Sequence, residues 1–191
     1  MKFFKVMALA AVAFVSATVA NAQDLGDSHS RVYAGYNNFS FFDAENSSNG
    51  FVAGYEYNFN CSGRVTNPLF ISAGLEYMFA TQEHASFQAL SVPVNFKYAF
   101  GSEKFAVTPY VGQSFRFGLV NESDVMDSKG NISSISLYDL DGVKRFQIMF
   151  NAGLNFQFGK WDLGYRFQVA EIKMGNGNTD YNHSFMLGYK F

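Results

Sequence analysis

The sequence alternates between apolar and polar residues over long stretches, and this period of two restricts the fold more than any other feature. From residue 146 to 158 every even position is apolar, whereas the odd positions carry Gln, Met, Asn and Gly. Residues 69–79 and 90–100 repeat the alternation. Successive side chains of a β-strand point to opposite faces, so each segment predicts a strand with one apolar and one polar face.

Eight segments of this kind predict an all-β protein, an eight-stranded antiparallel up-and-down transmembrane barrel. The connections 61–67, 101–104 and 159–160 fall on one side of the strands, whereas the longest connection, 121–144, falls on the other. Short turns at one end and long loops at the other are typical of barrels that cross a membrane. The expected strands span residues 31–42, 50–60, 68–80, 88–100, 105–120, 145–159, 160–171 and 180–191.

Two local irregularities are expected within these strands. In the first segment the apolar residues change faces after Tyr36, and a β-bulge near Asn37-Asn38 would bring them back to one face. Pro93 and Pro109 lie inside expected strands, where each removes a backbone donor. We therefore expect bulges or irregular pairing at both prolines.

The composition of the two faces indicates what each face contacts. Aromatic residues make up 18% of the chain and gather near both ends of the expected strands, as in the aromatic girdles of membrane barrels. The polar face is rich in Gly, Ser, Asn and Gln and carries few charges, which suits a narrow lumen where opposite charges pair. We predict a charge network inside the lumen, formed by Glu56, Glu76, Lys97, Arg116 and Arg166.

Two other readings of the alternation remain open at this point. A soluble periplasmic barrel that binds a lipid, as lipocalins do, has the same alternation with its apolar face inward. A narrow, low-conductance pore is the second alternative. An eight-stranded barrel, however, is just wide enough for its own side chains, which disfavours general diffusion.

The first residues predict export. Lys2 and Lys5 precede an apolar run, and residues 20–22 form an A-x-A cleavage site, so residues 1–22 are a predicted signal peptide. The mature barrel domain then spans residues 23–191 and contains no apolar run long enough for a membrane-spanning helix. The net charge of −2 for the whole chain becomes more negative after cleavage, so nucleic acid is not an expected partner.

The end of the chain carries a second pattern. Phe185, Leu187, Tyr189 and the terminal Phe191 alternate with small or polar residues. This stripe resembles the C-terminal assembly signal of bacterial outer-membrane barrels, which the barrel-assembly machinery reads during biogenesis. Together with the strand number and the signal peptide, it makes the mature chain similar to the small eight-stranded barrels, the OmpX-like proteins and the OmpA transmembrane domain. The resemblance implies a location in the cell outer membrane and contact with its lipid and lipopolysaccharide.

The sequence predicts no enzymatic activity, no cofactor and no metal site. The lipid A deacylase barrel, which resembles this class, uses a His-x-Ser pair that faces the membrane. Here His183 and Ser184 are adjacent, so a strand would point them to opposite faces. The other neighbours, His29 and Ser30, precede the first expected strand and so have no face toward the membrane. Cys61 is the only cysteine, so the chain forms no intrachain disulfide.

The long loop is the expected surface for interactions. Its acidic residues Asp124, Asp127, Asp139 and Asp141 form either a solvated, repulsive surface or a weak divalent-cation bridge to lipopolysaccharide phosphates. The stretch ISSISLY alternates as a strand does and would extend the fifth and sixth strands above the membrane as an exposed hairpin. An extracellular protein partner could add a strand to the free edge of this hairpin. We therefore expect an envelope structural role or a surface-interaction role.

Overall fold

The computed structural model confirms the all-β class. It describes residues 25–40, 47–82, 85–126, 132–139, 144–170 and 181–191. The strands are β1 (His29–Ser40), β2 (Ser47–Asn60), β3 (Leu69–Gln82), β4 (Ala85–Tyr98), β5 (Phe100–Gly101), β6 (Ala106–Met126), β7 (Ile132–Ser136), β8 (Phe146–Phe158), β9 (Trp161–Ala170) and β10 (Tyr181–Lys190), with a 3-10 helix η1 (Leu137–Asp139). Among these residues no helix is long and apolar enough to cross a membrane.

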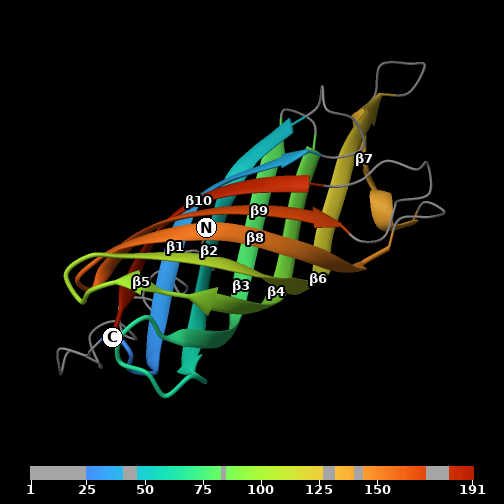
Figure 1. Cartoon of the computed structure of the whole chain (residues 1–191). Helices are drawn as coiled ribbons and strands as arrows, with labels where there is room; N and C mark the ends of the chain where they lie inside the picture. The colour runs from blue at the N-terminus through green and yellow to red at the C-terminus, as the bar shows by residue number, and fades with distance from the viewer. Residues whose placement is uncertain (1–24, 41–46, 83–84, 127–131, 140–143, 171–180) are drawn as a thin grey trace.

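The eight long strands close into a barrel, as predicted (Figure 1). Each long strand pairs antiparallel with its neighbours in the chain, β4 pairs directly with β6, and β10 pairs with β1. The short β5 lies in the turn between β4 and β6, and β7 pairs with the last residues of β6. The ring order is therefore β1-β2-β3-β4-β6-β8-β9-β10.

The register of the strands sets the width of the barrel. When the paired residues are followed from Asn49 on β2 around the ring through β1, the path returns to β2 at Phe59, ten residues further along. With ordinary strand rise and spacing, a stagger of ten residues over eight strands gives a tilt of about 40° and a backbone radius of about 8 Å. Side chains fill an interior of this width.

The two ends of the barrel differ. One end carries the connections 61–68, 99–105 and 159–160 and the C-terminus, and we call it the turn end (Figure 1). The opposite end carries the hairpin of β6 and β7, which extends past the ring, and we call it the loop end (Figure 1). β6 is longer than predicted, at 21 residues, because its last five residues pair with β7.

The predicted bulge at Asn37-Asn38 is wrong. The register of β1 runs without a shift against both β2 and β10. Phe39 therefore keeps the alternation and points into the lumen, where it is 1% exposed and meets the ring of Phe87 edge-on at 5.1 Å. Phe41, which suggested the same bulge, lies outside the described residues.

The two prolines behave differently from each other. Pro93 interrupts the pairing of β3 with β4 but leaves the register unchanged. The expectation of an irregularity at Pro109 is wrong, since β6 pairs with β8 there without a break. The pairing of β4 with β6 ends at Tyr110, so Pro109 has no partner residue on β4. The backbone N–H that proline lacks is therefore not needed on that side. The register of β4 against β6 shifts instead between Gln88 and Ala89, where β6 carries one extra residue, Leu119.

Apolar side chains cover the outside of the barrel and charged side chains lie inside. Leu75, Trp161 and Phe185 are each more than half exposed, at 54%, 54% and 57%. Glu76 and Lys97, by contrast, are only 1% and 3% exposed. This orientation is the one expected in lipid, and it is the reverse of a soluble carrier with an apolar cavity.

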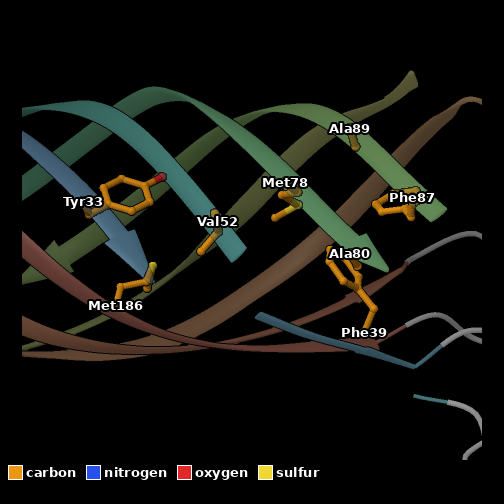
Figure 2. Close-up of a cluster of buried hydrophobic side chains, with 8 residues drawn as sticks. All are labelled: Tyr33, Phe39, Val52, Met78, Ala80, Phe87, Ala89 and Met186. Atoms are coloured by element: carbon orange, nitrogen blue, oxygen red, sulfur yellow. The ribbon is translucent and has the colours of Figure 1, made fainter. Parts of the chain in front are cut away.

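Part of the lumen is apolar, which the composition of the polar face did not indicate. Eight buried side chains form one apolar cluster: Tyr33, Phe39, Val52, Met78, Ala80, Phe87, Ala89 and Met186. Figure 2 shows them pointing into the space that the strands enclose. The lumen is thus a packed core with polar and apolar regions.

Candidate functional site

A buried ion network occupies the turn end of the lumen. Arg31 on β1 lies at its centre and donates two hydrogen bonds to Asp162, at 2.7 Å from Nε and 2.5 Å from Nη2. Its third nitrogen, Nη1, lies 3.1 Å from Glu56 Oε1. The same carboxylate oxygen accepts from Lys97 Nζ. Each side chain is at most 7% exposed, so the charges are shielded from bulk solvent and are compensated chiefly by one another.

A second ion pair spans the barrel. Arg166 Nη1 donates to Glu76 Oε2 at 2.7 Å, and the Tyr33 hydroxyl donates to the same oxygen at 2.8 Å. β3, which carries Glu76, and β9, which carries Arg166, lie opposite each other in the ring, four strands apart in either direction. A single pair of side chains therefore bridges the lumen.

Arg116 belongs to a different region of the lumen from the other predicted network residues. Its Nε donates to Gln147 Oε1 at 2.9 Å, and Nη2 donates to the same oxygen. The guanidinium also lies 5.3 Å from the ring centroid of Phe87 and 5.9 Å from that of Phe39. The predicted charge network is thus divided: Glu56 meets Lys97, Glu76 meets Arg166, and Arg116 meets an amide and two rings.

Amide and hydroxyl groups join six neighbouring strands between these regions. Asn151 Nδ2 donates to Asn95 Oδ1 at 3.0 Å and to Ser114 Oγ at 2.7 Å, and its own Oδ1 accepts from Gln168 at 2.8 Å. Asn182 continues the chain by donating to Gln168 Oε1 at 2.8 Å. Ser184 then bonds Asn182 Oδ1 and Asn37 Oδ1, so the network reaches from β4 to β1.

Sequence reasoning missed Arg31, the most connected residue of the ion network. Alternation contained the signal that would have found it. Val32 belongs to the apolar residues at the start of the first expected strand, so by parity its neighbour Arg31 points to the opposite, polar face. The supposed bulge further along the strand concealed this. Asp162 is the third residue of the seventh expected strand and shares the polar face of Arg166 by parity, but it is not among the residues of the predicted network.

In each of the two His-Ser pairs, the histidine and the serine point to opposite faces of the barrel wall. His183 is hydrogen-bonded through Nδ1 to the Tyr165 hydroxyl at 2.8 Å, whereas Ser184 is buried in the lumen. His29 and Ser30 are the first residues of β1, contrary to the expectation that they precede it. Ser30 faces outward and bonds the hydroxyl of Tyr55 at 2.8 Å, away from His29. Neither pair brings a base to a hydroxyl nucleophile.

The hairpin of β6 and β7 is held firmly at its base. Tyr138 in η1 lies over Gly118, where any Cβ would collide with the tyrosine hydroxyl. Arg145 stacks its guanidinium 4.5 Å from the Tyr138 ring and donates to Leu119 O at 3.4 Å. Ile135 on β7 is 38% exposed. Within the described residues, β7 pairs with no strand other than β6.

The predicted acidic loop residues are only partly described. Asp124 Oδ1 accepts from Ser134 Oγ at 2.5 Å across the hairpin, and Asp139 is exposed in η1. Asp127 and Asp141 lie outside the described residues, as do the predicted signal peptide and its cleavage site. In the part of the chain that the structure describes, no three His, Cys, Asp or Glu side chains gather as a metal site.

The predicted assembly stripe lies on the outer face of the last strand. Phe185 and Leu187 are 57% and 51% exposed, and the Tyr189 ring meets Trp161 edge-on at 5.0 Å. Phe191 closes the barrel through its backbone, since it exchanges two hydrogen bonds with Ser30, at 3.0 and 3.1 Å. These bonds explain how the end of the chain is fixed.

A closed barrel with an apolar exterior and paired ions inside defines the class of small transmembrane β-barrels. The profile of the outer membrane protein beta-barrel domain matches residues 7–191, so the chain belongs to this family. Its location is the outer membrane, and the alternative of a soluble periplasmic carrier is wrong. Among curated proteins, none matches the chain in sequence.

Two solved structures illustrate the similarity of the fold. The outer membrane enzyme PagL superimposes with a TM-score of 0.61 at 13% identity, covering 83% of this chain and 98% of that one. Ail, the attachment invasion locus protein of Yersinia pestis, superimposes with a TM-score of 0.53 at 16% identity, covering 86% of this chain and 99% of that one. One of these relatives is an enzyme and the other is named for attachment, so fold alone assigns no activity.

Proposed function

We propose that this protein is a closed, non-enzymatic outer-membrane barrel that acts at the cell surface through the hairpin of β6 and β7. The single observation that carries the proposal is the strand β7, which continues the sheet beyond the ring and pairs with one neighbour among the described residues. In barrels of this class the short turns face the periplasm. The loop end, with the hairpin, then faces the exterior.

The filled lumen supports an anchoring role over transport. The pair Glu76 and Arg166 crosses the lumen, and the buried amide and hydroxyl chain from Asn95 to Asn37 fills space along six neighbouring strands. Both groups are buried and hydrogen-bonded, so a hydrated ion would have to break the charge-assisted bond between Arg166 and Glu76 or displace buried amide groups to pass. These contacts disfavour the alternative of a narrow pore.

The hairpin has the features of a strand-addition site. Its base is fixed by Tyr138 and Arg145, so an incoming strand meets a preorganised edge. β7 is the short polar sequence ISSIS, which limits self-association while it leaves backbone groups for a partner. The partner class is an extended peptide segment of an extracellular protein.

Binding of extended peptides tests this function. Mature protein in lipid nanodiscs is used to select from a phage library of unstructured ten-residue peptides, and we expect enrichment of sequences with high β-propensity. Deletion of residues 124–140 should abolish binding of the selected peptides. Ile135→Lys should weaken it about fivefold to tenfold, because a lysine on an edge strand opposes pairing and an interface side chain contributes about 1 kcal/mol.

The matched control is Val65→Lys, which makes the same change at an exposed aliphatic residue of the opposite, turn end. This variant should bind as the unaltered protein does. The proposal fails if the deletion variant, still folded by its heat-dependent gel migration, selects the same peptides with the same affinity.

The absence of an enzymatic role is part of the same proposal. The geometry of His183 and Ser184 supports it, since their side chains lie on opposite sides of the barrel wall. The outer face offers lipid and lipopolysaccharide an apolar surface, which supports these molecules as the permanent surroundings of the barrel.

We also propose that residues 1–22 are cleaved and that the stripe Phe185, Leu187, Tyr189 and Phe191 is read by the assembly machinery. Phe191→Ala tests the signal separately from the fold. The backbone bonds to Ser30 use only main-chain atoms, so this variant retains them. We expect several-fold less protein in the outer membrane of cells, but an unchanged folding rate into pure lipid vesicles.

Phe158→Ala is the control for Phe191→Ala, because Phe158 is another exposed aromatic residue at the turn end, 51% exposed, but not at the chain terminus. It should reach the outer membrane in normal amounts. If both variants are lost equally in cells, the effect belongs to the aromatic girdle in general and the terminal signal is not supported.

A further inference from the structure

Residues 25–28 lie at the turn end of the barrel with Leu25 and Gly26 buried, and we call this segment the stopper. Leu25 is 4% exposed although it lies close to the start of the described chain. It packs with Phe70, Ala99 and Ala106 in a buried cluster separate from that of Figure 2. A leucine that precedes the first strand of a membrane barrel would ordinarily be exposed to solvent. The burial of Leu25 therefore indicates that this segment has a specific position at the end of the barrel.

Several contacts hold the stopper in this position. Asn60 Nδ2 donates to Gly26 O at 2.6 Å, and the Asn60 backbone N–H donates to Ser28 Oγ at 3.0 Å. Gly26 lies against the main chain of residues 64–65, where a Cβ would collide with backbone atoms. His29 donates through Nδ1 to Asp27 O at 2.8 Å. The segment is therefore fitted to the turn between β2 and β3.

A small polar cavity lies at the same end of the lumen. Its volume is about 30 Å³, room for about two water molecules. Arg31, Glu56, Lys97 and Asp162 of the ion network line it, and so does Phe70, which contacts Leu25. Two further lining residues have a buried polar atom without a hydrogen-bond partner among the described residues: Asn58 Nδ2 and Asn155 Oδ1. A buried donor and a buried acceptor of this kind are satisfied by water.

We propose that the stopper is a built-in lid that seals a hydrated chamber at the turn end and keeps the ion network from exchanging with the periplasm. Leu25 supplies the apolar seal, and Asn60 fixes the lid to the wall. Because the lid is one short segment held by one buried side chain and a few hydrogen bonds, it opens locally while the barrel stays folded. This device is independent of the hairpin at the loop end.

Cysteine accessibility tests the seal. In mature protein with Cys61→Ser, the reporter Asn58→Cys is introduced into the chamber wall, and labelling by a small cationic methanethiosulfonate reagent is followed in detergent micelles. We expect slow labelling with the intact stopper. Adding Leu25→Glu should accelerate labelling about tenfold to hundredfold, the factor that corresponds to the burial of one leucine. Leu25→Met should keep labelling slow.

A second reporter separates lid opening from general loosening. Ser184→Cys lies in the lumen, 0% exposed, within the amide chain toward the loop end. Its labelling rate should not respond to Leu25→Glu. The proposal is overturned if Asn58→Cys reacts equally fast with and without Leu25→Glu, or if both reporters accelerate together. Heat-dependent gel migration verifies folding, and deletion of residues 23–25 replaces Leu25→Glu if that variant does not fold.

Discussion

Glu76→Leu is expected to lower the free energy of unfolding by about 3–5 kcal/mol, the cost of leaving one member of a buried ion pair without its partner. Glu76 accepts from both Arg166 and Tyr33, so its removal leaves a cation and a hydroxyl uncompensated in the lumen. Urea unfolding in lipid vesicles measures the loss. Trp161, the only tryptophan, is 54% exposed on the outer face and reports the transition by fluorescence.

The double variant Glu76→Leu with Arg166→Leu is the decisive control. Replacement of a buried pair by apolar residues of similar volume is often neutral or stabilising, so the double variant should recover most of the lost stability. If the double variant is destabilised by the sum of the two single changes, the two residues are not coupled. The bridge across the lumen would then contribute nothing specific to stability.

Leu75→Arg is expected to destabilise the barrel by about 2–4 kcal/mol, because it places a charge near the middle of the hydrocarbon layer. Leu75 lies midway along β3 and is 54% exposed on the outer face. The same urea titration in vesicles measures the effect. The cost falls to about 0–1 kcal/mol for charges near the membrane interface, so depth is the variable that matters.

Leu69→Arg supplies the depth control on the same strand and the same face. Leu69 is the first residue of β3, six positions before Leu75, which is about 15 Å along the barrel axis at a tilt of about 40°. Leu69→Arg should lower the free energy of unfolding far less than Leu75→Arg does. Equal costs at the two positions would contradict the placement of Leu75 in the hydrocarbon layer.

Much of the barrel was predictable because alternation is a local property. The fifth and sixth expected strands began and ended within a residue of β6 and β8, except where β6 continues toward β7. The alternation of ISSISLY indicated this extension, because its first five residues form β7 and pair with the end of β6. The residue at which β6 ends depends on that pairing and not on a pattern within β6. The mistaken bulge had the opposite cause. Phe39 was assumed to need lipid, whereas the lumen provides it with Phe87 as an apolar partner.

The charge network was predictable in composition but not in its pairs. Alternation put Glu76 and Arg166 on the inner face, but nothing local connects two residues 90 positions apart. They meet because the ring of eight strands places β3 opposite β9. Arg116 is separated from them for the same reason, since the staggered register brings it to Gln147 and two rings.

By itself the sequence determined that this chain forms strands, how many long ones there are, and which of their faces meets lipid. These properties follow from the order of neighbouring residues, which a period of two records directly. Only the tertiary structure decided which ions pair, where the lumen is apolar, and that Leu25 returns to close one end. Each of these depends on the register that accumulates around a closed ring, and register is set by all the strands together.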